Sequence, residues 1–401
     1  MRKKEYNTIS PVIGLIKNCR RDILGAAIKK SSIKVVKRKN TSMLLRYIHS
    51  KENLSRAELK RLTGLSPTTV STLVDELIEE GLVKETGILE TKSSGRKAVS
   101  LEINPSGRHF AGVEIDGEKI AVDIYDLQFN PVVHKDAEPK SYPEILDFIL
   151  ETLKTAEREK NVKIYSIIIG FSGIIDSKLS KTLLSTVVDI SYGDFVADIK
   201  KEFMGARVEL LNTSELIAFA EKEERNSSDL ISIDIGKGVG SGIIIDGKIY
   251  KGAGGTAGEF GHISVDMNGP QCKCGNRGCT ELYTNTTVIK ERAKKILNKD
   301  NISLADIKKE SENQNEEIKA MLSDVAQILS FAIVGLINML APENVVISGK
   351  ITELGDEFLI PLKEAVAKKT SVTKTQIECS KIKGNSVTLG AAQYAFSKML
   401  G

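Results

Sequence analysis

Apolar positions between residues 40 and 81 recur with the period of an α-helix and fall into three groups separated by turn signals. The second group follows a capping box, in which Ser55 and Glu58 each accept from a backbone N–H near the other, and it ends at Gly64. The third group begins at Ser66-Pro67, a favoured N-cap and first turn, and ends at Gly81. The first and third apolar faces consist of Met43, Leu44, Leu45, Tyr47 and Ile48, and of Val70, Leu73, Val74, Leu77 and Ile78.

The third predicted helix carries short hydroxyl side chains opposite its apolar face, not the long charged side chains of a merely solvated surface. Residues 82–85 and 99–103 alternate as two strands, which a loop with a basic tip connects. Helices and strands in this order predict a winged helix-turn-helix over residues 40–104, although some such domains bind only proteins. Its last helix would read base edges in the major groove, and its loop would contact phosphates or the minor groove. The predicted DNA-binding residues are Ser66, Thr68, Thr69, Ser71 and Thr72 on the helix, and Arg96 and Lys97 in the loop.

Residues 1–39 show no clear periodicity and carry 12 basic against 2 acidic residues. The first recognisable helix begins near Asn40. This N-terminal extension is therefore either a DNA-contacting arm without fixed structure or the product of a misplaced start codon, with Val35 or Val36 as the alternative start.

Beyond Pro105 the pattern changes to alternating strands and helices, which predicts a separate α/β body over residues 105–401. Residues 110–116 and 119–125 predict a hairpin with Asp116-Gly117 at its turn. A similar opening recurs over residues 229–250, and the repetition predicts a duplicated fold of two lobes with a cleft between them. The other predicted elements are helices over 143–160 and 326–340, strands over 164–170 and 344–348, and a helix start at Gly390-Ala391-Ala392.

Composition and charge narrow the class of protein. With 401 residues, of which 41% are hydrophobic and 27% charged, the chain is typical of a soluble globular protein of two or three domains. The longest apolar runs, such as residues 164–175, fall short of the roughly 20 residues of a membrane span, and the N-terminus is a poor signal peptide. These features predict a cytoplasmic protein without a membrane partner.

The charge is distributed unevenly along the chain. Residues 1–100 hold 21 Lys and Arg against 10 Asp and Glu, whereas the remaining residues hold 36 against 43. A basic head on an acidic body is typical of a nucleic-acid-binding module joined to a module of another kind. A solvated basic tail is the alternative interpretation.

Three of the five cysteines lie within eight residues of one another. Cys272, Cys274 and Cys279 follow His262 in a loop over residues 258–281. Three thiolates and one imidazole make up the ligand set of a closed tetrahedral zinc site. The sequence therefore predicts one structural zinc ion per chain, and free or redox-active thiols are the alternative.

The run Gly258-Glu259-Phe260-Gly261-His262, followed by Cys-x-Cys-Gly-x-x-Gly-Cys-x-Glu at residues 272–281, resembles the ROK family of bacterial sugar kinases and sugar-responsive repressors. The resemblance extends from about Phe110 to the C-terminus and includes residues 236–242, 340–349 and 390–392. It implies a two-lobed, actin-like ATPase fold of the ribonuclease H-like class. It also implies that one ring nitrogen of the histidine faces zinc and the other the sugar. The sugar-binding residues that it implies are Asn212, Glu259, His262 and Glu281.

The sequence departs from the kinase pattern of this family at positions that handle phosphate and the transferred proton. Glu118 stands in the first phosphate loop, where a carboxylate repels an anion, and Lys237 stands in the second loop in place of Thr. Thr213 follows Asn212 where the kinases have their catalytic Asp, and a hydroxyl cannot take a proton from a sugar at neutral pH. Ser172 also replaces the Pro of the kinase cleft. These departures predict that phosphoryl transfer has been lost.

With a winged helix in front, the chain is similar to ROK regulators that respond to xylose, N-acetylglucosamine or glucose. The resemblance implies a homodimer or tetramer that binds a palindromic DNA operator and responds to a sugar held between the lobes. Two alternatives stay open: an active sugar kinase with a fused DNA-binding domain, and a repressor controlled by a phosphotransferase-system protein. The sequence leaves the sugar and the operator open.

Overall fold

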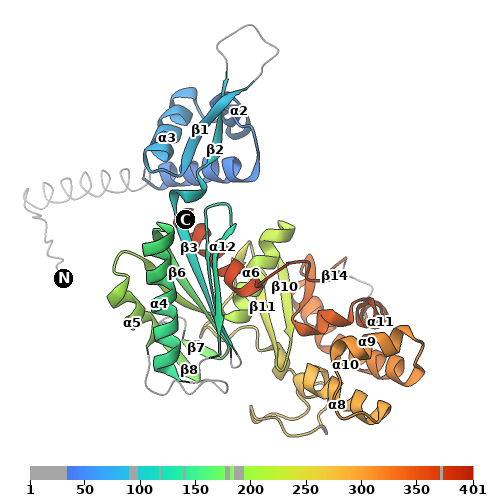
Figure 1. Ribbon diagram of the computed structural model, residues 1–401. Coiled ribbons are helices and arrows are strands. Elements are labelled where there is room, and N and C mark those ends of the chain that lie inside the picture. The colour runs from blue at the N-terminus through green and yellow to red at the C-terminus, as the bar shows by residue number, and fades with distance from the viewer. Residues whose placement is uncertain are drawn as a thin grey trace, which may run out of the picture. The chain divides into compact units, whose positions relative to one another are not determined.

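The computed structural model describes residues 34–89, 98–116, 119–138, 141–176, 181–184, 194–370 and 374–400. These residues form two compact units (Figure 1). One unit contains the described residues up to Gly107 together with residues 397–400, and the other runs from Arg108 to Phe396.

The N-terminal unit is a winged helix-turn-helix, as predicted. A helix runs through residues 34–50, and the other elements are α2 (Arg56–Thr63), α3 (Pro67–Glu79), β1 (Val83–Leu89), β2 (Ala98–Ile103) and η1 (Pro105–Gly107). β1 and β2 pair in antiparallel register, so that Val83 lies opposite Ile103. The side chains that form its core come from all three helices and both strands: Leu44, Leu45, Ile48, Leu59, Val70, Leu73, Val74, Leu77, Val83, Leu101 and Ile103.

The helix boundaries in this unit follow the predicted signals with one exception. Ser55 and Ser66 accept hydrogen bonds from the third backbone N–H of α2 and α3 at 3.2 and 3.1 Å. Gly64 ends α2 in the left-handed conformation, with φ of 70°. The capping box is only half formed, because the Glu58 carboxylate accepts from Arg61.

Elements of this unit run past two of the predicted domain limits. The first helix is already formed at residue 34, six residues before Asn40, and there the Lys37 ammonium pairs with Glu76 of α3 at 2.6 Å. The winged-helix unit extends past residue 104 to Gly107, because Asn104 bonds back to Leu82 and Gly81 and accepts from Gly107. Residues 1–33 lie outside the described part of the chain.

The first lobe of the body is a five-stranded sheet in the order β5-β4-β3-β6-β9. Alternate residues of β3 face opposite sides: Ala111 and Val113 pack against α4 and α5, whereas Gly112 contacts α12. The element bounds are β3 (His109–Ile115), β4 (Ile120–Tyr125), β5 (Pro131–Ala137), α4 (Tyr142–Lys160), β6 (Ile164–Phe171), α5 (Phe195–Glu202) and β9 (Arg207–Asn212). A small hairpin of β7 (Ile174–Asp176) and β8 (Lys181–Leu184) accompanies them.

The second lobe repeats this topology, as the duplicated pattern predicted. Its sheet order is β12-β11-β10-β13-β14, with the first three strands antiparallel and the last two parallel to β10. The strand bounds are β10 (Leu230–Ile235), β11 (Val239–Ile245), β12 (Lys248–Ile249), β13 (Asn344–Ser348) and β14 (Gln376–Cys379). The other elements are η2 (Phe260–His262), α7 (Glu281–Thr284), α8 (Thr286–Leu297), α9 (Leu304–Glu312), α10 (Glu316–Leu340), η3 (Lys350–Leu354) and α11 (Asp356–Ala367).

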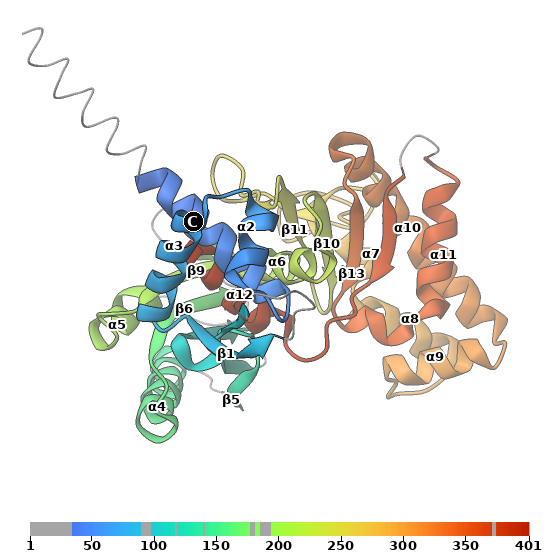
Figure 2. The same ribbon diagram turned by 90° about the horizontal axis from the view of Figure 1, so that it is seen from above.

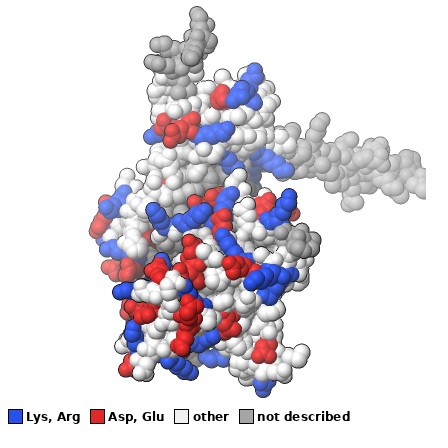
Figure 3. Space-filling view, turned by 90° about the vertical axis from the view of Figure 1, so that its right-hand side faces the viewer, with Lys and Arg blue, Asp and Glu red and all other residues white. Residues whose placement is uncertain are grey.

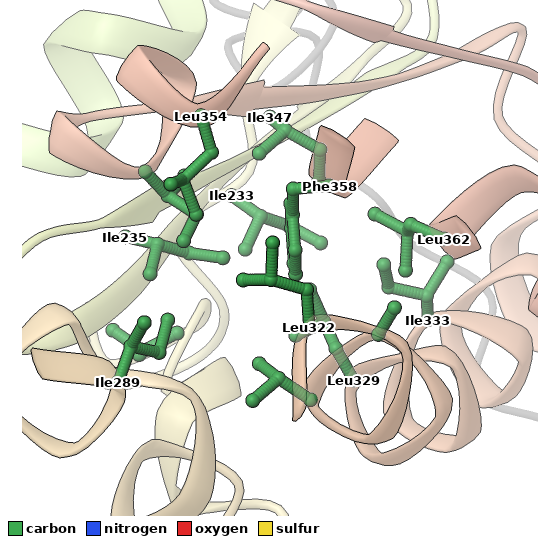
Figure 4. Packing of buried hydrophobic residues seen from close by; sticks show 14 of the residues in the cluster. Ile233, Ile235, Ile289, Leu322, Leu329, Ile333, Ile347, Leu354, Phe358 and Leu362 are labelled. Carbon is green, nitrogen blue, oxygen red and sulfur yellow. The ribbon is translucent and has the colours of Figure 1, made fainter. Parts of the chain in front are cut away.

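The core of the second lobe forms around α10 (Figure 4). Leu322, Leu329 and Ile333 of this helix meet Phe358 of α11 and Ile233 of the sheet. Each fully buried leucine contributes roughly 1.5–3 kcal/mol by leaving water. Among the described helices, α10 alone is long and apolar enough to span a membrane. It is longer than the apolar run over residues 164–175, which the sequence indicated as one of the longest. The sheet and neighbouring helices cover one side of it, whereas Phe331 and Met339 on the same helix are exposed.

Two helices lie between the sheets of the body, α6 (Thr213–Arg225) and α12 (Ser386–Leu400) (Figures 1 and 2). α6 is buried from Ser214 in its first turn to Glu221. The predicted helix start at Gly390 is wrong, since α12 begins at Ser386 after the cap residue Asn385. Gly390 lies inside the helix because it packs against the backbone of α6.

Candidate functional sites

The four predicted metal ligands lie together beside η2. His262 Nδ1 is 3.7 Å from Cys272 Sγ, and Cys274 Sγ is 3.6 Å from Cys279 Sγ. All four donor atoms lie within 4.8 Å of one another. A tetrahedral zinc ion holds sulfur ligands about 3.8 Å apart, so these spacings fit such an ion. The group can therefore hold a metal ion.

The loop that carries these ligands is fixed by backbone contacts. Isolated β-bridges join Ser264 to Cys279 and Gln271 to Arg277. Gly278 has a φ of 61°, and a Cβ at this position would lie 1.8 Å from the Asp266 carbonyl oxygen. Only glycine fits this close approach, and the next residue, Cys279, is paired with Ser264.

Without a cation the three thiols differ, because a backbone hydrogen bond from Asn276 lowers the pKa of Cys274, whereas the pKa values of Cys272 and Cys279 are raised. Burial, followed by the neighbouring thiols, raises the pKa of Cys279 to about 12, and burial also raises the pKa of Cys272. A bound metal cation favours the thiolate and displaces the proton. Cys379, the other described cysteine, lies outside this cluster.

Two of the predicted sugar-binding carboxylates lie on opposite sides of His262. The Glu259 carboxylate is 3.9 Å from Nε2, and the Glu281 carboxylate is 3.6 Å from Nδ1. Glu281 is also 3.6 Å from Cys272 Sγ, so it faces the metal ligands. One ring nitrogen thus points to the cysteine cluster and the other to Glu259.

A pocket opens between the two lobes. Asn212 and Glu259 line it, whereas His262 and Glu281 are not among its lining residues. Most of the other lining residues were not predicted as ligand-binding, and the signal they share is that glycine, serine and threonine predominate among them. The full lining is Gly173, Ile175, Asn212, Ser214, Glu215, Gly240, Ser241, Gly255, Thr256, Ala257, Gly258 and Glu259.

Asn212 caps α6 at the wall of this pocket. Its Oδ1 accepts from Ser214 N–H at 2.8 Å, and its Nδ2 donates to the Gly173 carbonyl at 3.0 Å. The second N–H of the amide remains for a ligand. Thr213, at the predicted position of the lost catalytic base, has its hydroxyl 3.3 Å from that of Ser172.

Glu215 lies deeper in the same wall. Burial raises its pKa, and Lys251, whose Nζ lies 3.4 Å away, opposes this shift. The ammonium is therefore already paired with a carboxylate.

Acidic side chains stand at the ends of β3 and β10, where the two lobes have equivalent strands. Burial raises the pKa of Glu114, whose carboxylate accepts from Asn385 at 2.6 Å, and nearby Asp116 and Asp234 raise it further. Burial also raises the pKa of Asp234, which accepts from Ser348 at 3.2 Å. The predicted phosphate-repelling residue Glu118 lies outside the described residues.

The predicted DNA-reading side of α3 is accessible. Ser66, Thr68 and Thr72 are exposed, and Thr69 and Ser71 are half-buried. The hydroxyls of Thr68 and Thr69 both bond to that of Ser66, at 2.9 and 2.8 Å. Arg96 and Lys97 lie outside the described residues.

Sequence reasoning missed Arg56, which fixes the orientation of α3. Its guanidinium donates to Asp75 of α3 at 2.7 Å and to Glu85 of β1 at 2.9 Å. Desolvation lowers its pKa, but the two carboxylates outweigh this effect and raise the pKa overall. The residue therefore joins α2, α3 and the wing by charge-assisted bonds.

Comparisons with known proteins cover both units. The ROK family profile matches residues 110–398, and the MarR family profile matches residues 39–87. The chain is 29% identical to a xylose repressor of Caldicellulosiruptor bescii over 91% of this chain and 97% of the relative. It is 30% identical to the xylose repressor of Bacillus subtilis, over 79% of this chain and 84% of the relative. It is 24% identical to the DNA-binding transcriptional dual regulator NagC of Escherichia coli, over 85% of this chain and 87% of the relative.

Solved structures share the fold. A ROK family transcriptional regulator, described as a homologue of the E. coli MLC protein, superposes with a TM-score of 0.78 at 22% identity over 91% of this chain and 98% of that one. A ROK family glucokinase of Streptomyces griseus, in complex with glucose and AMPPNP, superposes with a TM-score of 0.63 at 23% identity, over 72% of this chain and 99% of that one. The body thus has the fold of the ROK kinases, and the chain belongs to the ROK family.

Proposed function

We propose that this protein is a sugar-responsive DNA-binding repressor of carbohydrate-use genes. The observation that carries the proposal is that repressors align with both units, over 91% of the chain in one case. The kinase structure, by contrast, covers 72% of it. The chain thus joins a DNA-reading unit to a sugar-kinase fold with a pocket between its lobes.

DNA binding is assigned to the N-terminal unit. Thr68 and Thr72 on α3, with Ser66, Thr69 and Ser71 beside them, contact base edges, and Arg96 and Lys97 of the wing contribute charge toward phosphates. In Figure 3, acidic side chains gather on the face of the body, with basic ones around them. Such a surface does not attract a phosphate backbone. Two such units in a homodimer or tetramer would match a palindromic operator.

The effector is a small neutral sugar in the interlobe pocket. Glu259 and Asn212 supply hydroxyl partners, and His262 and Glu281 support Glu259 from the metal side. No Lys or Arg is among the described lining residues of the pocket, and the Lys251 ammonium is engaged by the lining residue Glu215, so the proposed ligand is neutral and not a sugar phosphate. D-xylose is the first candidate, because several relatives are named xylose repressors.

The His262, Cys272, Cys274 and Cys279 group holds one zinc ion in this proposal. Its role is structural, because four protein ligands close the tetrahedral shell and leave no site for a reacting water. The ion would order the loop that ends in Glu281.

Phosphoryl transfer is absent in this proposal. Glu118 stands in the first phosphate loop, where a carboxylate repels an anion, and Lys237 replaces Thr in the second loop. Thr213 cannot act as a general base. Closure of the cleft on a sugar would then serve to change the spacing of two DNA-binding units, and the protein acts in the cytoplasm.

The direct test is thermal unfolding of the protein in the presence of D-xylose, D-glucose and N-acetyl-D-glucosamine. A sugar that binds the folded protein raises Tm, by mass action. Stabilisation by one sugar supports the proposed effector site. Stabilisation by none of them would favour control by a phosphotransferase-system protein, the alternative that the sequence left open.

A further inference from the structure

The N-terminus of α12 is fastened to the first lobe by two carboxylates. Asn385 Nδ2 donates to Glu114 of β3 at 2.6 Å, while its Oδ1 accepts from the Val387 and Thr388 N–H groups at 2.9 and 3.1 Å. The Thr388 hydroxyl donates to the buried Asp123 of β4. One asparagine therefore caps the helix and ties it to the strand at the same time.

The middle of α12 touches the backbone of two other elements. A Cβ on Gly390 would lie 2.0 Å from the Leu216 carbonyl oxygen of α6. A Cβ on Gly112 of β3 would lie 2.4 Å from the Thr388 carbonyl oxygen. At these contacts no flexible side chain lies between the backbones. A displacement of α6 must therefore be shared by α12.

α6 begins in the wall of the pocket. Asn212, Ser214 and Glu215, its cap and first turn, line the pocket. The opposite wall is in equally close contact, because a Cβ on Gly242 of β11 would lie 2.2 Å from the Ser214 carbonyl oxygen. A ligand that draws the lobes together acts on the first turn of α6 directly.

α12 ends in the other compact unit. Among the described helices it alone has residues in both units, since residues 397–400 cluster with the winged helix. The Leu400 carbonyl accepts a hydrogen bond from the Ser42 hydroxyl of the helix over residues 34–50. The last turn of α12 is thus bonded to the first helix of the DNA-binding unit.

We propose that α12 carries the effect of ligand binding from the pocket to the DNA-binding unit, through α6, the Gly390 contact and the Asn385 clamp. This inference rests on the proposed function, because it requires a ligand in the pocket. Gly390 and Asn385 act as positioning residues in this mechanism, since neither touches the ligand.

Hydrogen–deuterium exchange on the full-length protein, with and without D-xylose, D-glucose or N-acetyl-D-glucosamine, separates the two proposals. A sugar that binds slows exchange in peptides around Asn212–Glu215, which tests the effector site. If α12 couples the pocket to the DNA-binding unit, exchange also slows in peptides that cover residues 386–400 and 34–50. Slowing at the pocket alone in the wild type overturns the coupling and leaves the effector site standing. No slowing in either region with any of the sugars overturns both.

Gly390→Ala should retain the slowing at the pocket and lose it at residues 386–400 and 34–50. Gly335→Ala is the matched control, because Gly335 lies inside α10 and a Cβ there would meet nothing within 4 Å. Slowing at all three regions in Gly390→Ala, as in the control, would overturn the proposal.

If Gly390→Ala does not fold, Asn385→Ser decides the question. Serine is a good N-cap, but it lacks the amide that donates to Glu114. Asn315→Ser, which changes the cap of α10 where the side chain accepts from Ile318 N–H, is its control. The coupling is supported if the sugar no longer slows exchange at residues 386–400 and 34–50 in Asn385→Ser but still does so in Asn315→Ser. It is contradicted if the sugar slows exchange at these residues in both variants.

Discussion

The Glu259 carboxylate lies 3.9 Å from Nε2 of His262. The other ring nitrogen of this histidine faces Cys272 Sγ at 3.7 Å, so a single imidazole separates the metal ligands from a residue that lines the pocket. A metal ion that fixes the ring would also fix the position of Glu259. Metal content and ligand response should therefore be lost together.

Cys274→Ser should remove the bound metal, because three ligands hold zinc far less tightly than a closed set of four. We expect close to one zinc per chain in the wild type and a large loss in the variant, measured by plasma emission spectrometry. The winged helix should stay folded. Cys379→Ser is the control, because this cysteine lies outside the cluster. An equal loss of metal in both variants would contradict the assigned ligands.

The double variant Thr68→Ala, Thr72→Ala should weaken operator binding by about 1 kcal/mol or more and relax base preference, because hydroxyls that contact base edges carry sequence information. Both side chains are exposed, so the fold should be unaffected. Ser50→Ala, at the exposed end of the first helix, is the control. Binding to a set of single-base operator variants measures the effect, and an unchanged preference would remove α3 from the base-reading role.

Thr213→Asp should not create sugar kinase activity. The variant restores a carboxylate at the position of the family base, but Glu118 still stands in the first phosphate loop, where it repels an anion. A coupled assay for ADP release with ATP and each sugar checks this. ADP release that depends on the sugar would show that the phosphate site is intact.

Glu114→Gln should stabilise the protein at pH 8 more than at pH 4.5. The folded-state pKa of Glu114 is raised above 4.5, mainly by burial. Such a carboxyl stabilises the fold below its unfolded pKa, and this contribution is lost as pH rises through the folded value. Glutamine can still accept from Asn385 without an ionisation cost. Thermal unfolding at the two pH values measures the effect, and a Tm gain that is larger at pH 4.5 would contradict the assigned shift.

The sequence predicted those features of the fold that are encoded locally. Ser55, Ser66 and Gly64 set the helix boundaries through their own backbone bonds, so the winged helix could be placed without a structure. The candidate metal-ligand group was equally clear, because most of its members lie in one short loop, and the structure brings all four donor atoms together. The repeated strand-pair opening, over residues 110–125 and 229–250, likewise predicted the two similar sheets.

Features that depend on distant partners were not predictable. Gly390 resembles a helix start in the sequence, and it lies inside α12 because a Cβ there would come within 2.0 Å of the Leu216 carbonyl oxygen, a contact that only the fold reveals. Arg56 reads as a solvated cation until Asp75 and Glu85 are placed beside it. The helix at residue 34 was missed because its first residues, including Val35 and Val36, are exposed and show no apolar face.

The measurement that tests the central claim most directly is the affinity of the full-length protein for its operator with and without sugar. The DNA is a duplex that the protein selects from a random library, and fluorescence anisotropy gives Kd. We expect D-xylose to weaken binding about 5–150-fold, the usual range of coupling between two sites. An operator affinity that no sugar changes, although a sugar stabilises the folded protein, would contradict the account.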